Sequence, residues 1–347
     1  MRAINVLSLF DGVSCARVAL ERANIKVNSY FASEIDKYCV AVVKYNNELK
    51  KNKDQFYPMT KQLGDVRYIK PSEAPKNVDL LIGGSPCQDL SISKKNRKGL
   101  EGERSGLFWD YVRIKKQLRP KWFILENVAS MSKESKNIIS EALGVEPIMI
   151  NASLVSAQNR KRLFWTNIPN VIQPKDRKIY LRNILEEAVK EKYSVNAVAF
   201  RGRNIVDGKR KDVLGAKTQQ CIEIGGEKAN TITSVYKDSM VRIGSIGKGG
   251  QGERIYDVGG KSVSLSALGG GRGAKTGLYE DGSKIRRLTP LECERLQGLP
   301  DNYTHSGLWY ENGKWIMRAN SEAQKYKMLG NAFNVDVVAH ILSFIPR

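Results

Sequence analysis

One short stretch organises this sequence: Asp79-Leu80-Leu81-Ile82-Gly83-Gly84-Ser85-Pro86-Cys87-Gln88. Its first residues are typical of a buried strand, and the two glycines end that strand. Pro86 has a fixed φ angle, so the thiol of Cys87 follows on a stiff turn. Reactive groups in open α/β sheets gather at the carboxyl ends of strands. Cys87 is therefore a candidate nucleophile, and the alternative is a small buried hydrophobic residue.

The composition narrows the class of protein. The chain has 347 residues, of which 41% are hydrophobic, enough for a sizeable core, and its length suggests about two domains. The net charge of +21 favours a polyanionic partner, most simply nucleic acid. No apolar run reaches the roughly 18 residues of a membrane span, and the N-terminal residues lack the pattern of a secretory signal. We therefore expect a cytoplasmic, nucleoid-associated protein that contacts no membrane.

The cysteines form no recognisable metal or disulfide framework. None of the five lies in a Cys-x-x-Cys motif, and the sequence has only two histidines. The cysteines are Cys15, Cys39, Cys87, Cys221 and Cys293. This pattern argues against a zinc site and against disulfides, so we expect no metal.

The N-terminal residues are predicted to open a nucleotide-binding α/β unit. Residues 4–10 have the pattern of a buried strand, and Asp11-Gly12 favours a turn. Residues 14–22 show helical spacing of apolar side chains, with Ser14 as the N-cap. A strand, a tight turn and a helix in this order are typical of the start of such a unit, although a single glycine is a weak fingerprint.

A second strand is predicted over residues 27–32 and ends close to Glu34. Glu34 follows Gly12 by 22 positions, and a carboxylate about 20 residues after the glycine turn suits the ribose hydroxyls of an adenosine cofactor. The alternative is an acid that starts the next helix, which is predicted over residues 37–53. Asp65, in a later turn, is a candidate for contact with the adenine edge or for a simple cap.

Residues 91–104 are predicted to form a mobile basic loop after Cys87. The segment is polar and carries five basic side chains. Such a segment suits a loop that closes over a phosphate backbone. The alternative is an ordinary solvated loop.

Two further strands are predicted to bring polar groups to the same region. After a helix over residues 107–118, residues 122–125 form a strand that ends at Glu126-Asn127-Val128. A carboxylate beside the strand that carries the thiol is a second convergent feature. Arg160 and Arg162 are two positions apart, so in an extended strand their side chains share one face. Guanidinium groups there would bind phosphates, carboxylates or carbonyl oxygens.

The alternation of strands and helices ends near residue 190. From 195 to 285 the chain is rich in Gly, Lys and Arg, with short β-like runs and glycine-rich loops at 244–254 and 269–275. This pattern predicts a small basic β-domain that reads a DNA groove. Recurring β-branched residues disfavour the alternative of a disordered linker.

Two helices are predicted after this β-rich region. One covers residues 286–297, with Thr289 as N-cap and Pro290 at the first helical position. The other is apolar, covers residues 335–344, and is predicted to pack back on the first domain.

Six motifs, in this order, resemble those of the C5-cytosine-specific DNA methyltransferase family of the bacterial and phage type. The resemblance covers nearly the whole chain except residues 168–285. The motifs are Phe10-Asp11-Gly12, Gly83-Gly84-Ser85-Pro86-Cys87-Gln88, Phe123-Ile124-Leu125-Glu126-Asn127-Val128, Gln158-Asn159-Arg160-Lys161-Arg162, Arg287-Leu288-Thr289-Pro290-Leu291-Glu292-Cys293-Glu294-Arg295-Leu296-Gln297-Gly298 and Gly330-Asn331-Ala332. Each motif alone is weak evidence, whereas six in the family's order are specific.

The resemblance implies an α/β fold of the class I S-adenosylmethionine-dependent methyltransferases. Its core would be a Rossmann-like, doubly wound, mostly parallel sheet, and a smaller, mostly β domain would recognise the target. Residues 1–190, completed by a C-terminal helix in 319–347, would form the catalytic and cofactor-binding domain. Residues 191–318 would form the target-recognition domain and hinge.

The implied activity is that of a DNA (cytosine-5-)-methyltransferase. It would transfer a methyl group from S-adenosyl-L-methionine to C5 of a cytosine flipped out of a short specific sequence, with S-adenosyl-L-homocysteine as product. Cys87 would add to C6, Glu126 would hold N3 and the exocyclic amine, and Arg162 with Arg160 would hold the O2 side. The implied catalytic residues are Cys87, Glu126, Arg160, Arg162, Pro86 and Asn127. The implied cofactor-binding residues are Phe10, Asp11, Gly12, Ser14, Glu34, Ile35, Asp65, Val66, Pro86, Leu107 and Asn331.

The implied partner is double-stranded DNA, bound by a monomer. A cognate restriction endonuclease, not physically bound, would accompany it if the protein serves restriction-modification. The residues expected to contact DNA are Ser85, Gln88, Ser91, Lys94, Lys95, Arg97, Arg242, Lys248, Arg254 and Arg272. Their phosphate contacts should make affinity fall steeply with salt.

The chain departs from the family's pattern near the cofactor. Asp is frequent where Ser8 stands, and Gly-Gly is frequent where Ser14-Cys15 stand. A bulky aromatic residue often occupies the position of Ile35, so aliphatic packing would replace stacking on adenine.

Three alternatives fit the sequence less well. The tRNA-directed members of this fold usually follow Pro-Cys with Phe-Thr, whereas Gln88-Asp89 follow here. A catalytically inactive DNA-binding regulator would lack one of the catalytic motifs, and all are present. A nicotinamide oxidoreductase is disfavoured by the single glycine of the first turn and by the positive charge.

Overall fold

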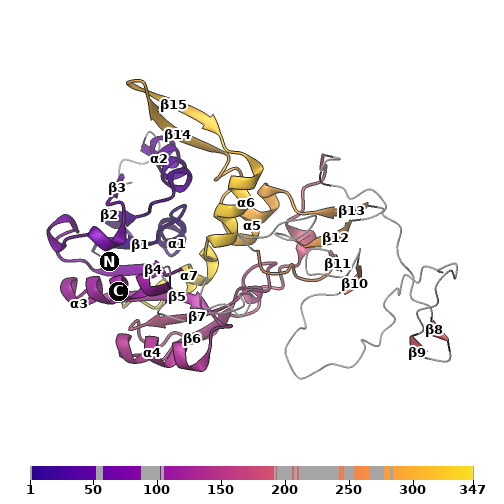
Figure 1. The fold of residues 1–347 in the computed structure, drawn as a ribbon, viewed down its shortest axis with the longest axis horizontal. Helices are drawn as coiled ribbons and strands as arrows, with labels where there is room; N and C mark the ends of the chain where they lie inside the picture. Colours follow the sequence, from indigo (N-terminus) through magenta and orange to yellow (C-terminus); the bar gives the residue numbers. More distant parts are fainter. Residues whose placement is uncertain are drawn as a thin grey trace.

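The computed structural model describes residues 2–51, 58–86, 102, 105–190, 193, 205–206, 209–210, 242–245, 254–265, 277–281 and 284–346 (Figure 1). Its centre is a seven-stranded sheet with the order β3-β2-β1-β4-β5-β7-β6. The strands are β1 (Ile4–Leu9), β2 (Val27–Ser33), β3 (Thr60–Gln62), β4 (Leu80–Gly84), β5 (Trp122–Val128), β6 (Ile148–Asn151) and β7 (Lys161–Thr166). This mixed, mostly parallel sheet confirms the predicted fold class.

The direction of winding reverses between β1 and β4. The pairs β1–β2, β2–β3, β1–β4 and β4–β5 are all parallel, whereas β7 is antiparallel to both β5 and β6. Because β1 and β4 lie side by side and the chain leaves them in opposite directions along the sheet, their carboxyl ends form its topological switch point, which is where sheets of this kind bind ligands.

Apolar side chains cover the central sheet on both faces. Along β1, Ile4 and Val6 belong to one apolar cluster, and Leu7 and Leu9 belong to the other. This alternation follows the two-residue period of a strand and explains why the strand reads as continuously hydrophobic.

Helices complete the two outer layers. The helices are α1 (Cys15–Arg22), α2 (Lys37–Lys51), α3 (Phe108–Leu118), α4 (Lys133–Leu143), α5 (Pro290–Gln297), α6 (Glu322–Asn331) and α7 (Val335–Leu342). Buried residues of α3 and α4 join one cluster, and those of the remaining helices join the other. As predicted, the apolar α7 packs back on the first part of the chain, against α1 (Figure 1).

A second sheet lies in the region predicted to be β-rich. It has the order β10-β11-β12-β13, and β11 pairs parallel with β12. The strands are β10 (Arg242–Ser245), β11 (Arg254–Asp257), β12 (Leu278–Asp281) and β13 (Lys284–Arg287). Two short strands, β8 (Ile205–Val206) and β9 (Lys209–Arg210), form a separate antiparallel pair. The domain boundary at 190–191 stays a prediction.

The helix predicted over 286–297 begins later than expected. Arg286 pairs with Tyr279 within the second sheet, so the strand β13 occupies the residues before Leu288. Thr289 then caps α5, as its position before Pro290 predicts. Packing in the sheet overrides the helical propensity of the arginines.

A hairpin that the sequence did not reveal follows α5. It consists of β14 (Ser306–Glu311) and β15 (Lys314–Ala319), joined at Asn312-Gly313, both with positive φ angles, as a two-residue hairpin turn requires. The hairpin lies along α2 (Figure 1), where the ring of Trp309 meets that of Tyr38 edge to face at 5.2 Å.

Candidate active site

Two adjacent glycines shape the end of β4. Gly83 pairs with Leu9 on one side, and Gly84 pairs with Glu126 on the other. A Cβ atom at Gly83 would lie 2.7 Å from the carbonyl oxygen of Leu9. At Gly84 it would lie 3.0 Å from Oε2 of Glu126. The glycines therefore let β4 approach β1 and leave room for the Glu126 carboxylate beside the turn that leads to Cys87.

Asn127 supports that turn through hydrogen bonds to Ser85. Its Nδ2 donates to the backbone oxygen of Ser85 at 3.2 Å and to the Ser85 hydroxyl at 3.1 Å. Its Oδ1 accepts from the backbone N–H of Val128 at 2.8 Å. Ser85 is only 4% exposed. The Ser85 hydroxyl thus helps to position the Ser85-Pro86 turn, and the expectation that Ser85 contacts DNA stays a prediction.

Glu126 and Arg162 come together from neighbouring strands. Nε of Arg162 lies 2.8 Å from Oε1 of Glu126, and both side chains remain partly exposed. Arg162 lies opposite Val128 in the β5–β7 pair, so the two side chains meet where β5 ends. The pair places a carboxylate and a guanidinium next to the Pro86 turn.

Arg160 lies elsewhere, which corrects the expectation that it shares a face with Arg162. It is only 3% exposed, and its guanidinium donates to the carbonyl oxygens of Leu265, Gly330 and Ala332 at 3.1, 3.2 and 2.7 Å. The strand β7 begins at Lys161, so the alternation rule does not extend to Arg160. Arg160 therefore binds carbonyl oxygens inside the protein, whereas Arg162 pairs with Glu126.

Glu34 joins the loops that follow β1 and β2. Its Oε2 accepts from the backbone N–H of Gly12 at 2.8 Å. Its Oε1 accepts from Ile35 at 2.8 Å and from Asp36 at 2.7 Å. An ionised carboxylate has about four acceptor sites, so these three bonds orient the group and leave capacity for one further donor. Ile35, alongside, is 71% exposed.

Asp11 and Ser14 turn their side chains into the protein. The Asp11 carboxylate accepts from the Tyr30 hydroxyl at 2.7 Å and from the Ser14 hydroxyl. Burial raises the pKa of Asp11 to about 6. Ser14 stands at the N-cap position but makes no capping bond, contrary to prediction, because its hydroxyl serves Asp11. Both side chains thus shape the turn after β1 from inside.

The other expected cofactor residues lie on loops near the same edge or on α6. Phe10 has a positive φ angle directly after β1. The Asp65 carboxylate accepts from the backbone N–H of Arg67 at 3.0 Å and pairs with the Arg67 guanidinium, so it caps a turn. Val66 is buried, Leu107 precedes α3 and is partly exposed, and Asn331 is exposed at the end of α6.

Several expected site residues lie outside the described part of the chain. These are Cys87, Gln88, Ser91, Lys94, Lys95, Arg97, Lys248 and Arg272. Arg242 and Arg254 belong to β10 and β11. Within the described residues, no group of three His, Cys, Asp or Glu side chains could hold a metal ion, and no helix is long and apolar enough to cross a membrane.

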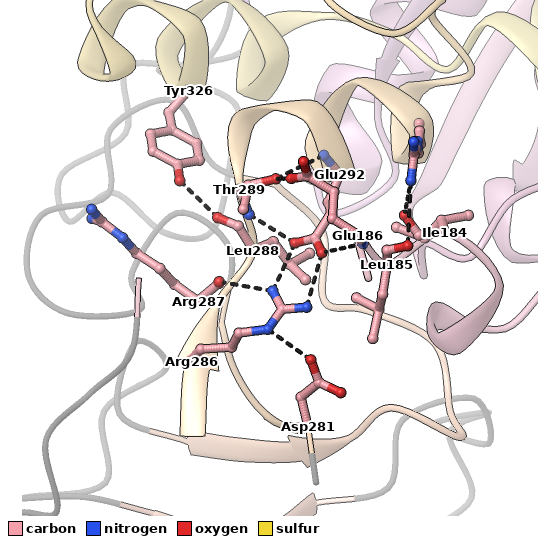
Figure 2. A network of polar contacts seen from close by, with 11 residues as sticks. Ile184, Leu185, Glu186, Asp281, Arg286, Arg287, Leu288, Thr289, Glu292 and Tyr326 are labelled. Carbon is pink, nitrogen blue, oxygen red and sulfur yellow. Dashed lines mark hydrogen bonds and ion pairs between the residues drawn. The ribbon is translucent and has the colours of Figure 1, made fainter. Parts of the chain in front are cut away.

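A buried ionic network connects the second sheet to α5 (Figure 2). The fully buried Glu292 carboxylate pairs with the Arg286 guanidinium at 2.9 Å and accepts from the backbone N–H of Thr289 at 2.8 Å and of Glu186 at 2.9 Å. Thr289 and Glu292 form a capping box. Their three-residue spacing is the only part of this network that the sequence alone indicates. The network fixes the direction in which the chain leaves the second sheet.

Known proteins resemble this chain over nearly its whole length. The profile of the C-5 cytosine-specific DNA methylase family matches residues 4–347. The type II methyltransferase M.HhaI of Haemophilus parahaemolyticus is 30% identical over 98% of this chain and 94% of its own. M.NgoPII of Neisseria gonorrhoeae, also type II, is 26% identical over 99% and 96%. The orphan methyltransferase M.Rho11sI of Bacillus phage rho11s is 26% identical over 81% and 61%.

Solved structures share the fold at lower identity. The Entamoeba histolytica methyltransferase EhMeth matches with a TM-score of 0.65 and 17% identity over 99% of this chain and 98% of its own. The Dnmt2 methyltransferase of S. pombe matches with a TM-score of 0.60 and 18% identity over 98% and 97%. At these identities the likeness supports the fold alone.

Proposed function

The chain belongs to the C-5 cytosine-specific DNA methylase family and is a DNA cytosine-5 methyltransferase, and on that premise we propose that Cys87 is its nucleophile and that Glu126 and Arg162 hold the target base. The observation that carries this proposal is the Glu126–Arg162 pair at 2.8 Å beside Gly84. Cys87 follows Gly84 by three positions, and Pro86 limits how the chain between them can bend.

The proposed chemistry starts with the low reactivity of cytosine C5. Addition of the Cys87 thiolate to C6 breaks the aromaticity of the ring and makes C5 nucleophilic. Glu126 shares a proton with N3 and accepts from the exocyclic amine, which relieves the negative charge that thiolate addition creates. Arg162 orients the Glu126 carboxylate and faces the O2 side. Once C5 carries the methyl group that the cofactor would supply, a base such as water takes the C5 proton and the Cys87 thiolate leaves C6, which restores the ring and the enzyme.

S-adenosyl-L-methionine, when bound, supplies the electrophilic methyl group. The loops after β1 and β2 fit its adenosine half. The Glu34 carboxylate is oriented by three backbone N–H groups and keeps capacity for a ribose hydroxyl. The exposed Ile35 offers an aliphatic surface to the adenine ring. We include Phe10, Val66, Leu107 and Asn331 in this site.

The substrate is proposed to be duplex DNA with one cytosine flipped out of the stack, because C6 is not accessible within it. The basic segment after Cys87 would contact phosphates, and the second sheet with its adjoining glycine-rich segments would read the sequence. Given the bacterial and phage relatives, we propose restriction-modification or orphan methylation, by a monomer in the cytoplasm of a bacterial or phage-infected cell.

A covalent-trapping experiment tests this mechanism. The purified protein is incubated with S-adenosyl-L-methionine and unmethylated plasmid, and bisulfite sequencing identifies the methylated motif. A duplex with 5-fluorocytosine in that motif should then form a stable adduct, because fluorine cannot leave C5 as a proton does. Cys87→Ala should still bind the duplex but form neither adduct nor product. Methylation by Cys87→Ala would refute the assignment.

A further inference from the structure

Residues 258–265, here called the strap, run between separate parts of the chain. The strap continues from β11 and bonds through its backbone to residues 181–182 on one side and to residues 157–159 on the other. These bonds are Arg182 N–H to Val258 O at 2.9 Å, Leu181 N–H to Gly260 O at 2.9 Å, Asn159 N–H to Ser262 O at 2.9 Å and Ser262 N–H to Ala157 O at 2.7 Å. The second sheet is thus connected to the loop that leads into β7.

Lys261 is a buried cation at the middle of the strap. It is 4% exposed, and its Nζ donates to the backbone oxygens of Ser153, Ser156 and Ile179 at 2.7, 3.3 and 2.6 Å. Burial lowers the pKa of Lys261. Within the described ranges no carboxylate forms an ion pair with it, so its burial is compensated mainly by the three carbonyl groups, together with the ring of Tyr180 at 5.2 Å and the charge of Asp176. A cation placed in this way holds both flanking segments in one fixed position.

Arg160 binds the end of the strap. Its Nη1 donates to the Ser264 hydroxyl at 3.3 Å and to the Leu265 oxygen at 3.1 Å, while Nη2 donates to the oxygens of Gly330 and Ala332. Arg160 is two positions before Arg162, which pairs with Glu126. Arg160 therefore anchors one end of the strap at a point two residues before Arg162 of the catalytic pair. The other end of the strap continues from β11.

From this arrangement we propose that Lys261 is a positioning residue that sets the second sheet relative to the Glu126–Arg162 pair and thereby controls DNA selectivity. The inference rests on the proposed role of the second sheet in reading DNA. The strap continues directly from β11, which carries the expected contact residue Arg254. A small displacement of this strand changes which duplex fits while the Glu126 and Glu34 sites stay intact.

The test compares Lys261→Met with Lys261→Arg and with Lys116→Met, which removes an exposed lysine on α3. Methionine has nearly the length of lysine but donates no hydrogen bond, whereas arginine keeps a buried cation with donors. Rates are measured at saturating cofactor against the methylated motif and against duplexes that differ from it by one base pair. Cofactor affinity is measured by calorimetry.

Lys261→Met should raise the KM for DNA and lower the preference for the motif about tenfold. The physical reason is that a misplacement of 1 Å can cost on the order of 100-fold in rate, and a smaller displacement costs correspondingly less. Its cofactor affinity and the behaviour of Lys116→Met should match the wild type, and Lys261→Arg should restore most of the preference. An equal loss of rate on all duplexes, with unchanged preference, would show a merely structural role and overturn the proposal. Lys261→Gln, uncharged but still a donor, provides the same comparison if Lys261→Met does not fold. A wild-type enzyme without any sequence preference would instead refute the proposed function of the second sheet.

Discussion

Substitution of Gly84 by alanine should damage catalysis with little effect on stability. The added Cβ would lie 3.0 Å from Oε2 of Glu126, whereas carbon–oxygen contacts are ordinarily about 3.3 Å or longer. The carboxylate must therefore move by roughly 0.3 Å or rotate away from its place beside Arg162. Since a 1 Å misplacement costs on the order of 100-fold in rate, a misplacement of about 0.3 Å should lower kcat about 4-fold.

The same substitution one residue earlier provides a matched control. At Gly83 the Cβ would lie 2.7 Å from the carbonyl oxygen of Leu9, a shortfall of about 0.6 Å from an ordinary contact. The obstacle is backbone of a central strand and cannot rotate aside. Gly83→Ala should therefore destabilise the protein by about 1 to 3 kcal/mol, as overpacking of a core does.

The assay pairs single-turnover methylation of a duplex with urea unfolding for each variant. Gly84→Ala should lose rate while its free energy of unfolding stays within about 0.5 kcal/mol of the wild type. Gly83→Ala should lose stability, and its folded fraction should retain more of the rate than Gly84→Ala does. Normal single-turnover kinetics in Gly84→Ala would refute the argument that the position of the Glu126 carboxylate limits the reaction.

Three further predictions concern carboxylates. Glu126→Gln should keep the fold and DNA binding but lose at least about 100-fold in single-turnover rate, and a near-normal rate would contradict its role. Glu292→Gln should lower the free energy of unfolding in urea by about 3 kcal/mol, because it leaves Arg286 buried without its main partner. Glu311→Gln, which removes an exposed ion pair with Arg318, should lower it by about 0.5 kcal/mol or less. Equal losses in the two variants would contradict this reasoning. The pKa of Asp11 is raised from 3.8 to about 6, so between these values the folded state keeps a proton that the unfolded state loses. The bound proton therefore stabilises the folded state fully below pH 3.8, and this stabilisation is lost as the pH rises through about 6. Asp11→Asn should therefore gain on the wild type by up to about 3 kcal/mol in unfolding free energy between pH 4 and pH 7, and a constant difference would show that Asp11 is not protonated in this way.

Much of the central sheet could be predicted because its signals are local. Apolar runs bounded by glycine, proline or acidic residues predicted β1, β2, β4 and β5 within a few residues. The proximity of Glu126 to the end of β4 also followed, since the carboxyl ends of neighbouring parallel strands meet at one edge.

Other features depend on tertiary contacts that no local pattern reveals. Arg160 and Arg162 have the spacing of one strand face, yet a strand that starts between them sends Arg160 to three distant carbonyl groups. No local pattern indicates that Ser85 is buried and bonded to Asn127. The β14–β15 hairpin was missed although Asn312-Gly313 is a strong turn signal, because its flanking residues do not alternate between apolar and polar.

The contact between α1 and α7 has a consequence for synthesis of the protein. The first helix leaves the ribosome early, but the helix that covers it ends only at Leu342. At about 5 to 20 residues per second, roughly 16 to 64 seconds separate the two events. Throughout that interval the part of α1 that α7 covers has no final partner, so the nascent chain is expected to need chaperone protection, and activity should appear only once α7 has been translated.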